Sequence, residues 1–348
     1  MESPAGSTTG ARFLLIAACL IVVVAGVKAA SDLMVPFLSA LFLAMITLPL
    51  LNWLRGRRIP TPLAVVITLV AALSVLAAVA IVVGGSISGF TAEVPKYQER
   101  LNEMTKEVFA WFEAHGIDLS SQLTTDLVNP ADAFGVAAGA LRGVASVLSN
   151  FFLVLLTVIF ILFEAAGFPD KLAAAFGSQS GSKRFERIKF EVQRYLGIKT
   201  LVSLATGVLI SIALAVIGVD FALLWGMLAF LLNYIPNLGS IIAAVPPVLL
   251  AVVQLGFGSA IAVAVVFIVA NIALGTFIEP QLMGRRLGLS TLVVFLSLVF
   301  WGWIWGPMGM LLSVPLTMIV KIMLENTEDL RWIAVLLGPA GKPPQQQS

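Results

Sequence analysis

The sequence has little charge. Asp, Glu, Lys and Arg make up 11% of its 348 residues, whereas 59% of the residues are hydrophobic. A soluble domain carries about twice that charged fraction, because its surface faces water. The shortage of charge therefore excludes an ordinary soluble domain and indicates a surface that faces membrane lipid. The net charge of +2 is not the strongly basic balance of a nucleic-acid-binding protein, so we expect no nucleic-acid partner.

The residues that most often carry catalysis are also scarce. Histidine and cysteine occur once each, as His115 and Cys19, so neither an internal disulfide nor a two-histidine metal site can form. The phosphate-binding Gly-x-x-x-x-Gly-Lys loop is missing. The glycine-rich run at residues 84–89 lacks the strand–turn–helix context of a nucleophile elbow. We therefore expect no enzyme, no cofactor and no metal.

Long apolar runs dominate the rest of the chain. A membrane-spanning helix needs about 20 mostly apolar residues, and barrel strands would instead alternate in polarity. The runs do not alternate, so the predicted fold is an all-α polytopic membrane protein. The runs occupy residues 13–27, 33–51, 63–83, 144–163, 201–219 and much of 222–320.

The distribution of charge predicts how the chain is oriented. Basic loop residues mark the cytoplasmic face, and Arg55, Arg57 and Arg58 follow the second run. We expect three regions: N-terminal membrane helices at 1–90, an acidic extracytoplasmic helical insert at 91–143, and a C-terminal transmembrane domain at 144–348. The last contains a basic, amphipathic cytoplasmic segment at 170–198. The predicted location is the inner (plasma) membrane, with lipid as a partner.

The insert also suggests contact between copies of the chain. Apolar residues between 97 and 112 recur at helical spacing, and Gly135, Gly139 and Gly143 form a ridge that allows close helix approach. We expect a symmetric homo-oligomer. The alternative is that these faces pack within one protomer.

Two of the apolar regions are interrupted at their centres. Residues 222–232 and 241–253 flank a polar turn that contains Pro236 and Gly239, and residues 295–301 and 310–320 flank a second turn that contains Gly306 and Pro307. A helix of 16 residues reaches about 24 Å, against about 30 Å of hydrocarbon. We therefore predict about six full spans plus two broken helical hairpins, or about eight to ten spans if the hairpins cross fully.

Three motifs resemble those of a known family. They are NYIPNLG at residues 233–239, IEPQLMGRRLGL at 278–289 and WGPMGMLLSVP at 305–315. They occur in the same order in the autoinducer-2 exporter family, also called the PerM-type permeases, and the hydropathy plan is similar along nearly the whole chain. The resemblance implies export of a small polar molecule such as a furanosyl signal. Several members of the family are linked to ion exchange instead.

The breaks supply the candidate site residues. Asn233 and Asn237 flank Pro236 at membrane depth, where they could bind cargo or cap the broken helix ends. The expected substrate-binding residues are Asn233, Pro236, Asn237, Gly239, Ser240, Gly306, Pro307 and Gly309. Glu279 is the candidate for ion or proton coupling, and its alternative role is an interfacial pair with Arg285 or Arg286.

These observations favour a secondary transporter that exports a small polar solute. The spans before and after each break predict that the two hairpins enter from opposite faces and that their tips meet near the membrane midplane. One alternative is a cation/proton antiporter that uses Glu279 as its intramembrane carboxylate. Another is a membrane scaffold or channel without coupled transport.

Overall fold

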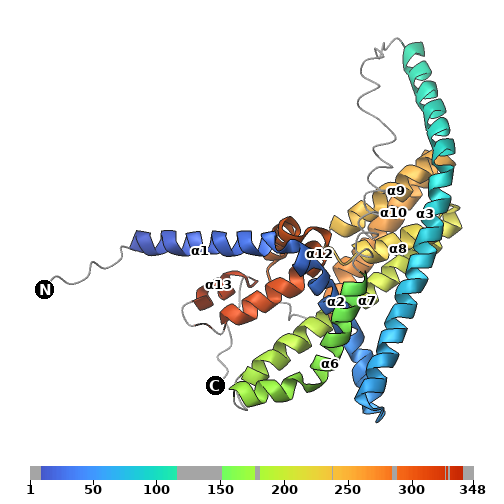
Figure 1. Ribbon diagram of the computed structural model, residues 1–348. Helices are drawn as coiled ribbons and strands as arrows, with labels where there is room; N and C mark the ends of the chain where they lie inside the picture. Colours follow the sequence, from blue (N-terminus) through green and yellow to red (C-terminus); the bar gives the residue numbers. More distant parts are fainter. Residues whose placement is uncertain are drawn as a thin grey trace.

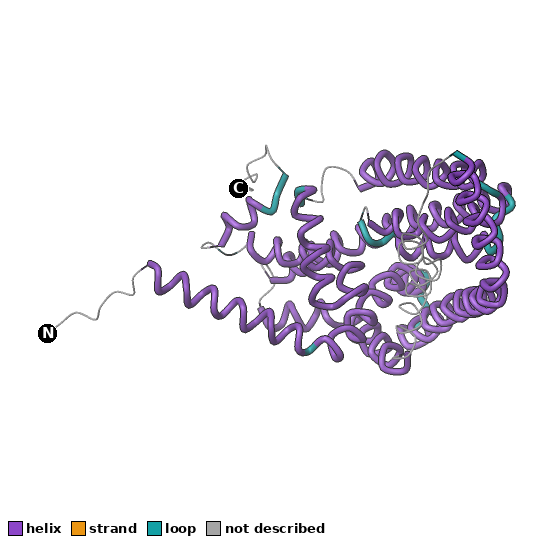
Figure 2. Tube along the Cα trace, turned by 90° about the horizontal axis from the view of Figure 1, so that it is seen from above, coloured by secondary structure: helices purple, strands orange, loops and turns teal. Residues whose placement is uncertain are grey.

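The structure is a computed structural model that describes residues 9–115, 151–176, 181–236, 238–283, 288–325, 327 and 330–339. Within these residues the regular structure is helical, and six helices are long and apolar enough to cross a membrane (Figures 1 and 2). The prediction of an all-α polytopic membrane protein is confirmed. The elements are α1 (Thr9–Ala29), α2 (Ser31–Gly56), α3 (Thr61–Ala114), α6 (Phe151–Phe176), α7 (Gly181–Ile217), α8 (Ala222–Leu232), α9 (Leu238–Leu255), α10 (Phe257–Ala270), the π-helix η1 (Asn271–Ile278), α11 (Glu279–Met283), α12 (Thr291–Glu325) and α13 (Arg331–Leu336).

The helices α7, α8, α9, α10, η1 and α11 pack together, and we call them the α7–α11 group. The α7 and α8 helices approach each other closely at glycine residues. A Cβ atom on Gly207 would lie 2.8 Å from the carbonyl oxygen of Gly226, and one on Gly226 would collide with Ser211. The two backbones are therefore in contact, as small residues allow between membrane helices.

A second group consists of α2, α6 and the first half of α3, and we call it the α2–α6 group. Its core contains Ala44 and Leu51 from α2, Ala64 and Val65 from α3, and Leu162 from α6, all buried. Small residues at the contacts let the three helices approach closely. The α12 helix packs against both groups, through contacts with α2 and α7.

The α3 helix runs along one edge of the molecule and contacts both groups (Figure 1). Its second half packs on α8: the ring of Phe90 meets those of Phe221 and Trp225 edge to face, and the Tyr97 hydroxyl donates to the Asp220 carboxylate at 2.8 Å. The boundary expected at residues 90–91 falls inside this unbroken helix. Residues 116–143 of the insert, including the glycine ridge, lie outside the described residues.

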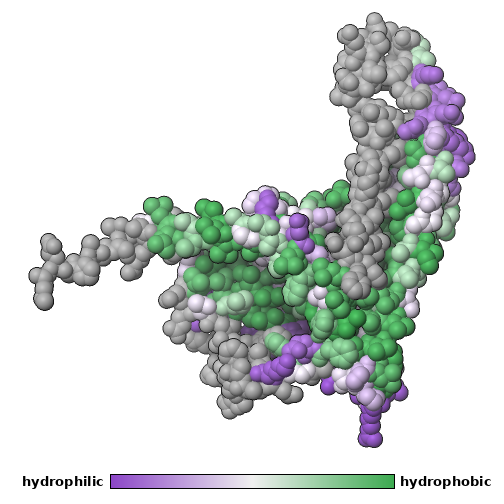
Figure 3. Space-filling view, viewed as in Figure 1, coloured by the Kyte–Doolittle hydropathy of each residue, from purple (hydrophilic) through white to green (hydrophobic). Residues whose placement is uncertain are grey.

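The α7 helix is also continuous across an expected boundary. The predicted amphipathic segment ends at residue 198 and the next apolar run begins at 201, but α7 runs unbroken from Gly181 to Ile217. Many large apolar side chains point outward in the described residues, among them Val70 at 55% and Leu201 at 59% exposure. Apolar residues cover much of the surface in Figure 3, while hydrophilic residues gather toward the Ala114 end of α3. Such a surface suits lipid.

Candidate functional site

The first predicted break is a tight turn between α8 and α9. The α8 helix ends at Leu232 after 11 residues, which is about 16 Å of helix and far short of a full span. The α9 helix begins at Leu238. A Cβ atom on Gly239 would collide with the carbonyl oxygen of Leu232, so the return of the chain requires glycine at this position. Asn237 lies outside the described residues.

The polar side chains of this turn are bonded to α7. Asn233 Nδ2 donates to Ser203 Oγ at 2.9 Å, and the Tyr234 hydroxyl donates to Thr200 Oγ1 at 2.8 Å. Ser203, Asn233 and Tyr234 are all buried. Buried polar groups need such partners, because an unpaired one costs about 1–3 kcal/mol. The first turn is therefore closed onto a row of hydroxyls on α7.

Aromatic contacts also stabilise the same turn. The Tyr234 ring meets Phe230 of α8 at 5.8 Å and Phe42 of α2 at 5.5 Å, both edge to face. Edge-to-face pairs are worth about 0.5–1.5 kcal/mol beyond the area they bury. Because Phe42 belongs to α2, this contact joins the tip of the first turn to the other helical group.

One helical turn along α7 from the Ser203 contact, Lys199 forms an ion pair with Glu279. Lys199 Nζ lies 2.9 Å from both carboxylate oxygens of Glu279, and the two side chains are 5% and 15% exposed. Glu279 is the first residue of α11 and follows the eight-residue π-helix η1. Such π-helical segments are uncommon and are frequent at functional sites. Arg285 and Arg286, the partners considered from sequence, lie outside the described residues.

The second predicted break is a sharp turn inside α12. Trp305 (φ −124°, ψ 18°) and Gly306 (φ 60°, ψ −144°) leave the helical conformation, and the positive φ explains the glycine. Trp301 Nε1 then donates to Thr317 Oγ1 at 3.0 Å. Residues 16 apart would be separated by about 24 Å in a straight helix. The chain therefore folds back on itself, and Gly309 lies against the carbonyl of Trp301.

The second turn packs where α1 meets α2. Trp305 Nε1 donates to the Val27 carbonyl at 3.4 Å, and Lys28 Nζ lies 3.6 Å from the centre of the Trp303 ring. Gly306, Pro307 and Gly309 thus surround a turn that is anchored on the N-terminal helices. The first turn is anchored on α7 and on Phe42 instead. With Asn237 outside the described residues, a meeting of the two tips stays a prediction.

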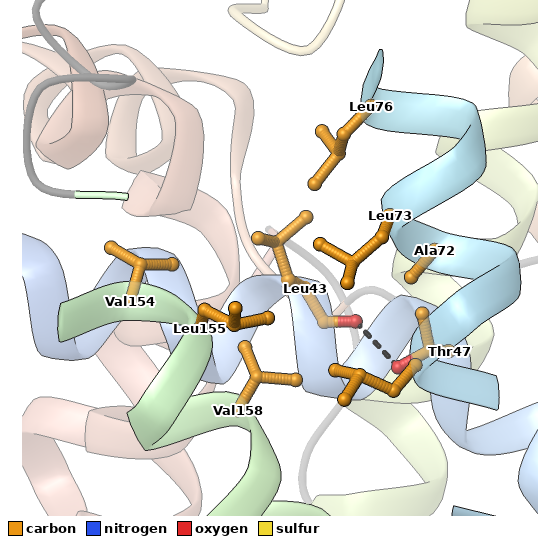
Figure 4. Close-up of a pocket in the computed structure, with 9 residues that line it drawn as sticks. Leu43, Thr47, Ala72, Leu73, Leu76, Val154, Leu155 and Val158 are labelled. Atoms are coloured by element: carbon orange, nitrogen blue, oxygen red, sulfur yellow. Dashed lines mark hydrogen bonds between the residues drawn. The ribbon is translucent and has the colours of Figure 1, made fainter. Parts of the chain in front are cut away.

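The small cavity between α2, α3 and α6 is apolar (Figure 4). Its volume is about 30 Å³, and its walls include Leu43, Leu73, Leu76 and Val158. Thr47 supplies the hydroxyl of the lining, and that group already donates to the Leu43 carbonyl at 2.9 Å. Thr47 carries the hydroxyl among these otherwise apolar side chains, so the lining offers a polar solute few partners. The hydroxyl row on α7 is therefore the better candidate site.

Comparison with known proteins decides the class of the protein. Residues 17–329 match the model of the AI-2E family transporter. The chain belongs to this family. The AI-2 transport protein TqsA of Escherichia coli (strain K12) is 38% identical over 343 residues, covering 98% of this chain and 100% of TqsA. YhhT of the same organism is 38% identical over 344 residues, covering 99% of this chain and 98% of YhhT.

Membership of the AI-2E family confirms several predictions. It is a family of transporters and not of enzymes, and it places the chain in the inner membrane as a multi-pass protein. A relative from Haemophilus influenzae is 40% identical over 334 residues, covering 94% of this chain and 96% of that relative. The resemblance read from the three motifs is thus confirmed across nearly the whole chain.

The predicted site residues of this AI-2E transporter fall into two places. Asn233, Pro236, Gly239 and Ser240 belong to the first turn or its edges, and Gly306, Pro307 and Gly309 belong to the second. Sequence reasoning did not single out Thr200 and Ser203, because hydroxyls are common on membrane helices. It did not single out Lys199 either, because this residue directly follows the basic segment predicted at residues 170–198. The spacing of Lys199, Ser203 and Thr206 could have pointed to them, because residues at this spacing share one face of a helix.

Proposed function

We propose that this AI-2E transporter is a secondary transporter that exports a small polar molecule through the first turn. The observation that carries the proposal is the buried pair of hydrogen bonds between that turn and α7, Asn233 to Ser203 and Tyr234 to Thr200. The name of TqsA, an AI-2 transport protein, supports a solute of the same class. Broken helices that carry polar tips are the usual binding elements of such transporters.

Cargo binding would exchange these internal bonds for bonds to the solute. A neutral hydrogen bond contributes only about 0.5–1.5 kcal/mol net, so a hydroxylated solute can replace Ser203 or Thr200 as the partner at little cost. Asn233 offers both a donor and an acceptor, and Tyr234 offers a hydroxyl. Glycine at 239 lets the start of α9 pass close to the carbonyl oxygen of Leu232 at the end of α8, which keeps the turn tight.

The remaining expected residues receive supporting roles in this proposal. Pro236 lacks a backbone donor and keeps the first turn from closing into helix, and Pro307 does the same in the second turn. Asn237 and Ser240 remain candidate cargo-binding residues, because their side chains are polar and they follow Pro236 in the sequence. Gly306 and Gly309 shape the second turn, which contributes backbone groups to the opposite side of the path.

The alternative function is cation/proton antiport with Glu279 as the intramembrane carboxylate. One observation favours it: Glu279 is nearly buried and directly follows a π-helix. Carboxylates are uncommon within membrane-spanning segments, so such a residue is a candidate for ion or proton binding. Lys199, however, already occupies both of its oxygens at 2.9 Å. A cation would have to displace that ammonium group, so solute export accounts better for the pairing. A scaffold or channel would need neither broken segment.

The orientation and the assembly belong to the same proposal. Residues 91–143 are extracytoplasmic, and both ends of the chain, the loop after α2 and the first part of α7 are cytoplasmic, as their basic residues indicate.

The protein is a symmetric homo-oligomer whose insert supplies the contact. Native mass spectrometry in mild detergent with lipid retained should give a multiple of the protomer mass, and a protomer mass alone would contradict the assembly.

Counterflow in proteoliposomes tests the proposed transport. The purified full-length protein is reconstituted and loaded with one unlabelled solute or cation from a panel, and uptake of the labelled compound is followed with and without a pH gradient. Accumulation of a neutral polar solute supports export of that class. Accumulation of a cation alone, dependent on the pH gradient, would favour the antiporter. Uptake that equilibrates without overshoot would indicate a channel.

A further inference from the structure

The α3 helix has a different kind of contact on each side of a glycine pair. Before the pair, Ala72, Leu73 and Leu76 line the cavity of the α2–α6 group. After it, Phe90 and Tyr97 hold the helix to the α7–α11 group through aromatic contacts and the hydrogen bond to Asp220. Between these anchors, and before the glycine pair, α3 already touches the α7–α11 group through aliphatic side chains such as Val79 and Val83, which carry no directional bond.

Packing within the described residues does not require Gly84 and Gly85. Both are exposed there, and a Cβ atom on either would meet no described atom within 4 Å. Neither has a positive φ, so the backbone conformation does not demand glycine. Each glycine in a helix interior costs about 1 kcal/mol relative to alanine. Two adjacent glycines therefore weaken α3 at this point without any packing gain in the described residues.

A third glycine in the same run shows the contrast. A Cβ atom on Gly89 would lie 3.0 Å from Cε1 of Phe221, which is tighter than an ordinary contact. Gly89 thus makes room for the ring that anchors α3 to α8. The run at residues 84–89 therefore combines one glycine that serves packing with two that do not.

Hydroxyl groups give the weakened turn an alternative set of hydrogen bonds. Ser88 Oγ donates to the Gly84 carbonyl at 3.0 Å, and Thr91 Oγ1 donates to the Ile87 carbonyl at 2.9 Å. Bonds of this type bend helices, because the hydroxyl competes with the backbone N–H for the same carbonyl. If α3 bends here, the Gly84 carbonyl keeps a partner in a setting with little water.

We infer that Gly84 and Gly85 form a hinge in α3 that lets the α7–α11 group change its angle to the α2–α6 group during transport. The anchors fix which part of α3 moves with which group: residues up to Leu76 follow α2 and α6, and residues from Phe90 follow α8. Because Phe42 of α2 touches Tyr234 in the first turn, such a motion would also separate that ring contact and open the turn. This inference rests on the proposed transport function.

The distance between two spin labels, one on either side of the glycine pair, measures bending of α3 without any cargo. In the full-length protein with Cys19→Ser, Val70→Cys and Glu99→Cys place two labels on exposed positions of α3. The labels are 29 residues apart, about 44 Å in a straight helix. In lipid nanodiscs, we expect a broad distance distribution for the native glycines. Gly84→Ala with Gly85→Ala should narrow it toward the long end.

Transport and stability complete the test. The double alanine variant should transport roughly five- to twentyfold more slowly, while its unfolding temperature stays equal or rises. Gly26→Ala is the matched control, since it also adds a methyl group to a helix where no described atom lies within 4 Å; its unfolding temperature should likewise stay equal or rise, but its transport rate should not change. A narrow distribution for the native protein, or equal widths for native and double variant, would overturn the hinge. A change of oligomer mass with unchanged width would also overturn it and assign the glycines to a contact between copies. The spin-label distances are measured without cargo. A failure of the hinge can therefore be distinguished from a failure of the proposed transport function.

Discussion

Lys199 and Glu279 are 80 residues apart in the sequence, yet the ammonium nitrogen lies 2.9 Å from both carboxylate oxygens. The pair joins α7 to the start of α11 and lies one turn from the Ser203 contact of the first turn. The Lys199 side chain is buried and that of Glu279 is nearly so. Removing one partner of a buried pair leaves the other charge uncompensated, so the two residues depend on each other more than surface pairs do.

Replacement of Lys199 by methionine should destabilise the protein strongly. We expect Lys199→Met to lower the free energy of unfolding by about 3–5 kcal/mol, because Glu279 then stays buried without a partner. Lys199→Met with Glu279→Met should recover most of that loss, since neither charge remains. Unfolding followed by intrinsic fluorescence in detergent measures both variants.

An exposed pair in the same chain is the control. Lys171 Nζ also lies 2.9 Å from a carboxylate oxygen, that of Glu164, but these side chains are 68% and 51% exposed. Lys171→Met should therefore leave stability almost unchanged. Equal losses for Lys199→Met and Lys171→Met would show that burial of the Lys199–Glu279 pair does not matter.

Alanine at position 239 should disrupt the first turn. The added Cβ atom would collide with the carbonyl oxygen of Leu232, and that oxygen belongs to the backbone and cannot rotate away. We expect Gly239→Ala to lower stability by roughly 1–3 kcal/mol and to abolish most transport. Gly258→Ala, where the new methyl group meets nothing within 4 Å, should retain both. Native-like unfolding of Gly239→Ala would contradict the tight return between α8 and α9.

The orientation of the chain can be checked by cysteine labelling. In a Cys19→Ser background, Ala110→Cys should react with a membrane-impermeant maleimide from outside intact cells, because it lies in the predicted extracytoplasmic insert. Arg57→Cys, in the basic loop after α2, should react only after the membrane is opened. Reaction of Ala110→Cys from the cytoplasmic side alone would reverse the assignment.

The parts of the fold that sequence could predict are those encoded locally. Pro236 and Gly239 mark the first turn, and Gly306 and Pro307 mark the second, because these residues impose their backbone preferences wherever they stand. Apolar runs of sufficient length likewise predict the spanning helices. The bend of α12 at Gly306 and the end of α8 at Leu232 both lie where the sequence predicts a break.

The contacts that sequence could not supply join distant residues. Lys199 reads as one more basic residue near the membrane surface until the fold brings Glu279 to it. The hydrogen bond from Tyr97 to Asp220 spans 123 residues and carries no local signal. Thr200 and Ser203 look like the many hydroxyls that bond back to their own helix, as Thr200 Oγ1 also does with the Leu196 carbonyl. Only the packing of α8 on α7 shows that they face the first turn.

If the first turn binds the cargo, as we propose, substitution of Asn233 should impair transport more than substitution of a buried polar residue elsewhere. Counterflow of the polar solute that the native protein accumulates should be compared between Asn233→Ala and Ser297→Ala, in proteoliposomes matched for reconstituted protein. Ser297 is also a buried polar residue, but its hydroxyl donates to the Val294 carbonyl within its own helix. We expect Asn233→Ala to lose at least about nine-tenths of the accumulation, equivalent to about 1.4 kcal/mol of binding, and Ser297→Ala to keep the native rate. Native accumulation by folded Asn233→Ala would contradict cargo binding by the first turn.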